Sequence, residues 1–252
     1  MKLWICTAFF SMVAFAIAQN DAGYSAFAKA NTAYTNGDYQ EAINSYNSIL
    51  QSGLQSAEVY FNLGNAYYKQ NEVGPAIFNY EKALQLDPGN KEVKNNLRFA
   101  QQLRIDAIQP LAENPIEKFL KDTATSTTVD NWAYISIILA LIAVLMFLLY
   151  HYAKTTGKKR LFFTLSLILF LLVVLSIVAA SYAHNLNNSS NQAIVFSQET
   201  VTRAEPKSNA DPSFAVHEGT KVSILEEYQN WAHIQLANGS EAWMPLADLK
   251  KL

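Results

Sequence analysis

The stretch AEVYFNLGNAYYKQNEVGPAIFNYEKALQLDPGN spans Ala57–Asn90 and carries the most regular pattern in this chain of 252 residues. Small and apolar residues share one face of each of two helices: Leu63, Gly64 and Tyr67 in the first, Ala76, Tyr80 and Ala83 in the second. Pro88 ends the second helix, because proline cannot continue its hydrogen-bond ladder. The sequence therefore predicts a helical hairpin whose helices approach closely at Gly64 and Ala76.

A weaker copy of this pattern lies 34 residues upstream. Ala42 and Tyr46 precede Ala76 and Tyr80 by that period, and Gly37-Asp38 supplies the corresponding turn. A repeat of this length is typical of a helical solenoid, in which each unit buries its apolar face against the next. We predict an all-α solenoid at residues 23–104, with repeats at 23–56 and 57–90 and a capping helix after them.

Residues 57–90 resemble the tetratricopeptide repeat at its signature positions, with Tyr60 in place of the common tryptophan. The resemblance implies a peptide-binding groove. By the repeat's register, six residues line or border it: Asn31, Asn62, Asn65, Lys69, Asn96 and Phe99. Asparagine side chains can pair with the backbone amides of an extended peptide. The alternative is that these residues form an ordinary solvated helix face.

Two runs without charged residues, 132–152 and 161–183, are each long enough to cross a hydrocarbon core of about 30 Å. Buried helices of a soluble domain are the alternative. The connecting residues 153–160 hold three lysines and one arginine, which predicts a cytoplasmic loop by the positive-inside rule. Small residues such as Ala143, Ser166 and Ser176 permit close helix contacts, either between the two helices or with another subunit. The sequence thus predicts a transmembrane helical hairpin.

The N-terminus has the features of a secretory signal. Lys2 precedes an apolar stretch, and Ala16-Ile17-Ala18 offers small residues for cleavage. We predict a signal peptide at 1–18, with an uncleaved anchor as the alternative. Both possibilities place the large segments outside the cytoplasm. Cys6 is the only cysteine and lies within the signal, so the mature chain would hold no thiol nucleophile or disulfide.

The large segments on either side of the apolar runs are acidic. Residues 19–131 carry 9 Lys and Arg against 13 Asp and Glu, and residues 184–252 carry 5 against 8. Nucleic acid is therefore not an expected partner. Residues 105–131 contain Pro110, Pro115 and a threonine-rich tract, which indicates a linker, although 115–121 could form one amphipathic turn on a membrane.

Residues 184–252 show a different pattern, of short strands. Segments 193–196, 221–225, 231–236 and 241–244 are rich in β-branched and aromatic residues, and Asn238-Gly239 indicates a hairpin. This density suits a small all-β barrel. Glu218-Gly219-Thr220, Trp231 and the run Ala242-Trp243-Met244-Pro245 resemble a bacterial SH3-type domain. The resemblance implies a ligand face that includes Trp231 and Pro245; alternatively, Trp231 and Trp243 mainly pack the core.

The sequence contains no glycine-rich phosphate loop and no histidine-rich metal spacing, and its four histidines are scattered. We therefore expect no enzymatic activity, no metal and no cofactor. A serine nucleophile beside a base would require an arrangement that the sequence does not indicate.

The order of signal, tetratricopeptide repeats, helical hairpin and SH3-like domain resembles the BatE family of bacterial aerotolerance (Bat) operons, over nearly the whole chain. That resemblance implies an inner-membrane protein of Gram-negative bacteria with both large domains periplasmic. It also implies von Willebrand A-domain membrane proteins as partners and, indirectly, a MoxR-type AAA+ ATPase. We expect a scaffold in a stress-tolerance complex. The alternative is a peptidoglycan-binding or sensing protein that acts through the SH3-like domain.

Overall fold

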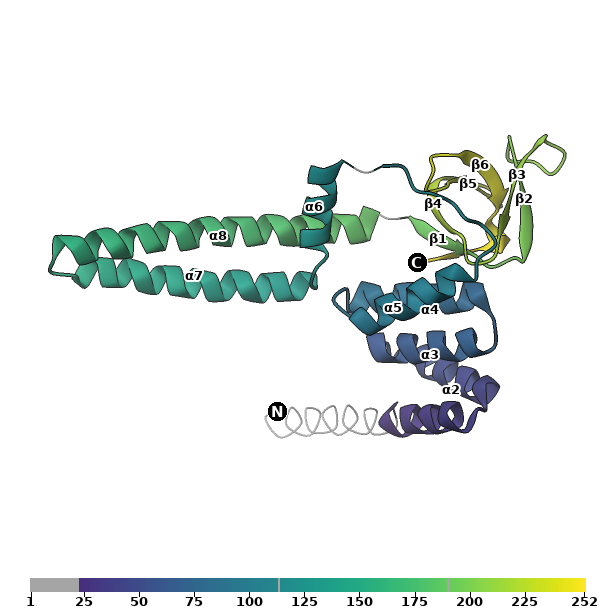
Figure 1. Cartoon of the computed structure of the whole chain (residues 1–252), viewed down its shortest axis with the longest axis horizontal. Helices are drawn as coiled ribbons and strands as arrows, with labels where there is room; N and C mark the ends of the chain where they lie inside the picture. Colours follow the sequence, from purple (N-terminus) through teal and green to yellow (C-terminus); the bar gives the residue numbers. More distant parts are fainter. Residues whose placement is uncertain (1–22, 113, 190) are drawn as a thin grey trace, which may run out of the picture. The chain divides into compact units, whose positions relative to one another are not determined.

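The computed structural model describes residues 23–112, 114–189 and 191–252 (Figure 1). The predicted signal peptide at 1–18 lies outside these residues. The described chain divides into two compact units. The first contains the helical repeats through Pro110 together with Gln192–Leu252, and the second contains Leu111–Asn191 with the short turn Asp87–Gly89.

Helical hairpins form the N-terminal part of the first unit. A helix whose described part covers residues 23–36 is followed by α2 (Tyr39–Gln51), α3 (Ala57–Lys69), α4 (Val73–Leu86) and α5 (Lys91–Gln102). Ser56 caps α3 by accepting a hydrogen bond from the Val59 amide, and Asn90 caps α5. Gly37 adopts a φ of 87° at the predicted turn. The helical hairpins predicted from the 34-residue period are confirmed.

The repeats bury their signature residues. Tyr46 and Tyr80 are each 1% exposed, and Ala42, Ala76 and Ala83 are fully buried. A Cβ atom on Gly64 would lie 2.8 Å from ring atoms of Tyr80 and 3.3 Å from the Ala76 carbonyl oxygen. Glycine is therefore required there by close packing, as the sequence predicted.

The C-terminal part of the first unit is an antiparallel sheet, which we call the β module. Its strands are β1 (Gln192–Val195), β2 (Glu199–Arg203), β3 (Pro212–His217), β4 (Lys221–Tyr228), β5 (Trp231–Gln235), β6 (Glu241–Pro245) and β7 (Leu249–Lys251), and a 3-10 turn, η1 (Leu246–Asp248), precedes β7. Their order in the sheet is β3-β2-β6-β5-β4-β1-β7. No strand pair among the described residues joins β3 to β7, so the sheet is open. An SH3-like barrel therefore stays a prediction.

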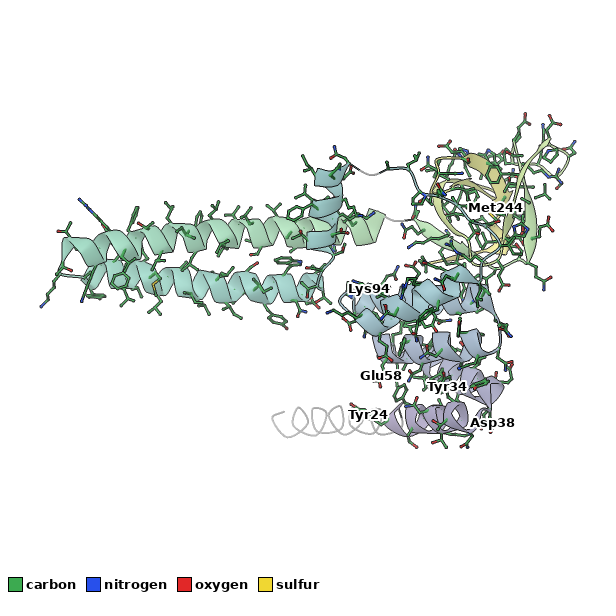
Figure 2. The ribbon with its side chains drawn as sticks, in the orientation of Figure 1. Tyr24, Tyr34, Asp38, Glu58, Lys94 and Met244 are labelled. Carbon is green, nitrogen blue, oxygen red and sulfur yellow. The ribbon has the colours of Figure 1, made fainter. Side chains whose placement is uncertain are left out.

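One apolar core fills the β module. Val195, Val216, Ile234 and Met244 are fully buried in it, and Figure 2 shows Met244 among the strands. The alternation of buried and half-buried residues along β5 and β6 places Ala232 and Ile234 inward. The predicted turns contain Gly219 and Gly239, whose φ angles are 81° and 84°.

Three helices form the second unit: α6 (Pro115–Ala124), α7 (Val129–Tyr152) and α8 (Thr156–Ser189). Two of them, Val129–Tyr152 and Thr156–Leu186, are long and apolar enough to cross a membrane, with mean hydropathies of 2.7 and 3.0. They run side by side (Figure 1). The hydroxyls of Ser136 and Ser176 lie 2.8 Å apart, and the Ser166 hydroxyl donates to the Ala143 carbonyl at 3.2 Å. Small residues thus do lie where these helices meet.

Residues 105–131, expected to be a linker, contain regular structure. Asn114 caps α6 through the Ile116 amide, and the Trp132 indole donates to the Ala124 carbonyl at 3.0 Å. The apolar side chains Ile116, Phe119 and Leu120 of α6 are more than half exposed. An amphipathic helix thus occupies Pro115–Ala124 within this region, whereas residues 105–112 form neither helix nor strand. Proline and threonine obscured it in the sequence because both serve equally well at helix starts and in loops.

Replacing Gly64 with alanine should destabilise the α3–α4 hairpin, although alanine favours helix more than glycine. The added methyl meets the buried Tyr80 ring, and overpacking of this kind costs about 1–3 kcal/mol. Hydrogen–deuterium exchange of α3 and α4 should accelerate in the variant. Lys94→Ala, at an exposed position of α5 (Figure 2), should leave exchange unchanged. Slower exchange in Gly64→Ala would show that helix propensity dominates at this position.

Candidate functional site

The predicted groove asparagines lie on the first helix of each hairpin. Asn31 belongs to the helix at 23–36, Asn62 and Asn65 to α3, and Asn96 to α5. The carbonyl oxygen of Asn31 accepts hydrogen bonds from the Tyr46 hydroxyl at 2.5 Å and from the Asn62 amide nitrogen at 3.1 Å. The structure therefore brings Asn31 and Asn62 together on neighbouring helices.

The same arrangement recurs one repeat later. The carbonyl oxygen of Asn65 accepts hydrogen bonds from the Tyr80 hydroxyl at 2.7 Å and the Asn96 amide nitrogen at 2.8 Å. Each of its three members lies 34 positions after its counterpart in the first set. We call these six residues the asparagine ladder: Asn31, Tyr46, Asn62, Asn65, Tyr80 and Asn96. The ladder shows that α5, which was predicted as a capping helix, occupies the position that the first helix of a third repeat would have.

Each pair of asparagines keeps one donor and one acceptor free of partners among the described residues. In the first pair these are the Asn31 amide nitrogen and the Asn62 carbonyl oxygen, and in the second the equivalent atoms of Asn65 and Asn96. A donor and an acceptor side by side match the two hydrogen-bonding groups of a peptide unit. All four asparagines are half-buried, so their orientations are fixed while these atoms stay near the surface.

The tyrosine hydroxyls hold the ladder as neutral donors. Burial raises the pKa of Tyr46 to about 12, and hydrogen bonding with Asn62 offsets only part of that effect. Burial also raises the pKa of Tyr80. Both hydroxyls stay protonated throughout the physiological range and can donate to the asparagine carbonyls.

Lys69 and Phe99, the other predicted groove residues, are not part of the ladder. Lys69 lies exposed in the last turn of α3, and Phe99 is 47% exposed on α5. The Arg98 guanidinium lies 5.3 Å from the Phe99 ring centroid. In the described part of the chain, neither Lys69 nor Phe99 hydrogen-bonds the ladder. Both are free to contact a partner without any loss of internal structure.

The predicted ligand residues of the β module face one another. Trp231 on β5 is the direct cross-strand partner of Pro245 on β6. Two positions along, His233 pairs with Trp243, and their rings stack at a centroid distance of 4.9 Å. Neither Trp231 nor Trp243 belongs to the apolar core of the β module. Both are half-buried on the face opposite the core, because the inward positions belong to residues such as Ala232 and Met244.

A second polar site, which the sequence did not predict, lies where the helical repeats meet the β module. One carboxylate oxygen of Asp106 accepts hydrogen bonds from the His217 amide at 2.7 Å and the Thr220 hydroxyl at 2.6 Å. The other carboxylate oxygen lies 2.7 Å from the His217 ring nitrogen Nδ1. The Asp106 side chain is only 13% exposed. We call this set of contacts the Asp106 anchor.

Further contacts surround the Asp106 anchor. Lys221 of β4 forms an ion pair of 2.9 Å with Glu81 of α4, and the Glu218 carboxylate accepts from the Gly74 amide at 2.9 Å. Ile194 of β1 packs within the apolar core of the repeats. These contacts connect residues more than a hundred positions apart; the sequence predicted the segments that carry them but not the contacts themselves.

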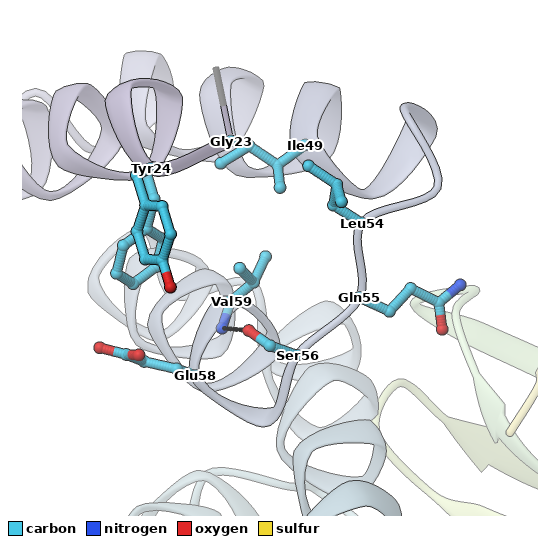
Figure 3. Close-up of a pocket in the computed structure, with 9 residues that line it drawn as sticks. Gly23, Tyr24, Ile49, Leu54, Gln55, Ser56, Glu58 and Val59 are labelled. Carbon is cyan, nitrogen blue, oxygen red and sulfur yellow. Dashed lines mark hydrogen bonds between the residues drawn. The ribbon is translucent and has the colours of Figure 1, made fainter. Parts of the chain in front are cut away.

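A hollow of about 270 Å³ lies between the helix at 23–36 and the start of α3 (Figure 3). Apolar side chains, including Ile49, Leu54 and Val59, form much of its lining. Tyr24 and Glu58 are the only ionisable residues among the nine that line it. Over the part of the chain that the structure describes, no three His, Cys, Asp or Glu residues are grouped so as to hold a metal ion.

Comparison with known proteins supports the assignment of the repeat. The family description "Tetratricopeptide repeat" matches residues 57–90. Mouse sperm-associated antigen 1 is 44% identical over 72 residues, and the rat protein is 42% identical over the same length. These matches cover 29% of this chain and 8% of each relative. The chain contains a tetratricopeptide repeat. Such repeats commonly mediate protein–protein interactions and are generally non-catalytic.

The Asp106 anchor should weaken in acid. Burial raises the pKa of the Asp106 carboxyl, but hydrogen bonds from Thr220 and His217 outweigh burial and leave the pKa below its ordinary value of 3.8. A depressed carboxyl pKa stabilises the fold above that value, and the stabilisation is lost as the pH falls below it. Thermal unfolding should therefore show Asp106→Asn to be less stable by about 1–3 kcal/mol near neutrality, with the difference shrinking below about pH 4.

Asp211→Asn is the matched control, because Asp211 is exposed and the same chemical change there should alter stability little. A pH-independent difference between wild type and Asp106→Asn would contradict the assignment of the anchor to the ionised carboxylate.

Proposed function

We propose that this protein is a non-catalytic membrane scaffold that binds extended segments of partner proteins along the asparagine ladder. The observation that carries the proposal is the repetition of the ladder, which presents the same free donor and acceptor at a period of 34 residues. A peptide lying across the first helices could pair its backbone with both sets. Lys69 and Phe99 supply charge and apolar surface beside them.

The resemblance of module order to the BatE family suggests the biological setting. We propose a subunit of a Bat-type aerotolerance or stress complex, with von Willebrand A-domain membrane proteins as direct partners and a MoxR-type AAA+ ATPase acting indirectly. The β module would be an SH3-like domain. The tetratricopeptide repeat at 57–90 supports the interaction role, since such repeats commonly bind proteins.

Anchoring in the inner membrane is part of the same proposal. The helices α7 and α8 expose apolar side chains along their length. Exposing so large an apolar surface to water is unfavourable, whereas contact with lipid is not. The lysines and arginine of residues 154–160 lie at one end of this pair. Ile116, Phe119 and Leu120 of α6 could rest in the lipid interface, where amphipathic helices lie along the surface.

The proposed topology can be measured with single cysteines, because Cys6 is the only native one. In a Cys6→Ala background, Ser48→Cys and Ser213→Cys should react with an impermeant maleimide on intact spheroplasts. Thr155→Cys should react only after lysis, since its loop would be cytoplasmic. Labelling of all three positions in lysed cells controls for reactivity. The opposite pattern of protection would exclude a periplasmic ladder.

Partner binding can be tested by crosslinking the tagged protein in its native membrane and identifying captured proteins by mass spectrometry. Lys69→Glu combined with Phe99→Ala should reduce recovery of von Willebrand A-domain proteins about tenfold, as expected for loss of a few central contacts. The ladder remains intact in this variant. Lys94→Glu, an equal charge change at another exposed position, should have no effect. Undiminished recovery with the double variant would exclude this face as the interface.

A second function is supported by the half-buried face of the β module. Trp231, His233, Trp243 and Pro245 form a row of rings on β5 and β6, a surface suited to peptidoglycan peptides or sugars. Retention on purified peptidoglycan that Trp231→Ala abolishes, without unfolding the sheet, would favour a cell-wall binding protein. Capture of cell-wall hydrolases in place of von Willebrand A-domain proteins would agree with that result.

A further inference from the structure

A second hollow, of about 350 Å³, lies where the helical repeats meet the β module. This size is within the usual range for ligand pockets, about 300–1,000 Å³. Its lining comes from five places in the fold, all within the same compact unit: α2, the loop that follows it, α3, α4 and the β module. None of the ladder residues belongs to its lining. The hollow is therefore separate from the proposed partner-binding face.

Two lysines without acidic partners lie at or beside this hollow: Lys250 is part of its lining, and Lys82 lies next to the ring of Phe78, which is also part of the lining. The Lys250 ammonium is 4.5 Å from the Phe78 ring centroid and 5.3 Å from that of Phe196, and both rings line the hollow. Lys82 lies over the same Phe78 ring at 5.7 Å. Within the described residues, no carboxylate pairs with either lysine, although Lys221 nearby on the same module is paired with Glu81. The local charge is therefore positive and uncompensated.

The surroundings make this positive charge costly. Burial, and next the neighbouring Lys250, lower the pKa of Lys82, and burial lowers that of Lys250. The lining contains no Asp or Glu. A bound anion would offset both the loss of hydration and the mutual repulsion of the two ammonium groups.

The rest of the lining is suited to a peptide rather than to a simple inorganic ion. Four side-chain amides line the hollow, from Asn47, Gln51, Gln55 and Asn79. Asn47 and Asn79 use their nitrogens internally, on the Tyr67 hydroxyl and the Pro75 carbonyl, which leaves their oxygens able to accept from peptide N–H groups. Tyr60 and Tyr67 add ring surface. The amide oxygens could accept from a peptide backbone, the rings could contact an apolar side chain, and the cation could bind a carboxylate.

We propose that this hollow is a binding site for a short peptide, held through a carboxylate at Lys250 and Lys82. The carboxylate could come from the peptide's C-terminus or from an acidic side chain, and both present the same group to the lysines. Since both modules line the site, a bound peptide would also stabilise the contact that the Asp106 anchor maintains.

Saturation-transfer NMR on the full chain in detergent micelles tests the proposal with three tetrapeptide pools. The first pool has free C-termini and no acidic side chains. The second is amidated and carries one glutamate per peptide, and the third is amidated and neutral. We expect signal from the first pool, the second or both, and none from the third. Which of the charged pools binds identifies the source of the carboxylate.

Lys250→Gln should weaken the best peptide by at least about tenfold, the usual cost of losing a charged hydrogen-bond partner. Lys250→Arg should retain most of the affinity. Lys251→Gln is the matched control, because the next residue on β7 pairs with Glu227 and does not line the hollow. If Lys250→Gln fails to fold, Lys82→Gln serves as the second variant. Equal binding of the neutral pool, absence of binding by any pool, or unchanged affinity in the lysine variants would each overturn the proposal.

Discussion

The Asp106 carboxylate connects the two halves of the first structural unit. Asp106 lies just after α5, at the end of the helical repeats. Its carboxylate forms hydrogen bonds with a backbone amide, a hydroxyl and a ring nitrogen of the β module. A buried carboxylate is tolerated only when its oxygens are paired in this way. The ion pair of Lys221 with Glu81, the hydrogen bond from Gly74 to Glu218 and the packing of Ile194 against the repeats lie around it. The contact between the two modules thus combines one ionised side chain, which is bonded to two residues, with these surrounding interactions.

The helical part of the fold was predictable because its information is periodic. A repeat of 34 residues fixes which positions are inward, so Gly64, Ala76 and Tyr80 could be assigned to packing before any coordinates. The register of the same repeat predicted that Asn31, Asn62, Asn65 and Asn96 line or border one groove. It did not reveal that Tyr46 donates to Asn31 and Tyr80 to Asn65, although both tyrosines recur at the same period. The same spacing between an asparagine and a buried tyrosine occurs twice within the chain, and this repetition was the signal that could have shown the hydrogen bonds.

The contacts between modules were not predictable, for a physical reason. Asp106 and His217 are 111 positions apart, and neither belongs to a periodic pattern. Asp106 was assigned to a linker and His217 stands next to a predicted turn, and charged residues in such places are common and usually solvated. The weak strands β2, β3 and β7 were missed for a similar reason, because their short polar segments resemble loops until neighbouring strands pair with them. Local pattern reveals what is repeated or amphipathic, and it does not reveal a single long-range hydrogen-bonded set.

The two proposed binding surfaces of the first unit, the asparagine ladder and the hollow at Lys250, differ in which polar groups are left without partners. On the ladder, each asparagine forms a hydrogen bond with a neighbouring asparagine, and this bond fixes the orientation of its remaining donor or acceptor. A fixed donor and acceptor lose little entropy when a peptide pairs with them, so even a shallow face can bind usefully. At the hollow, charges as well as amide oxygens are left without partners, because Lys82 and Lys250 have rings beside them but no carboxylates. The ladder therefore suits the backbone of any extended segment, whereas the hollow would discriminate by charge. A scaffold with both surfaces could hold one partner through its backbone while it senses an acidic end of another.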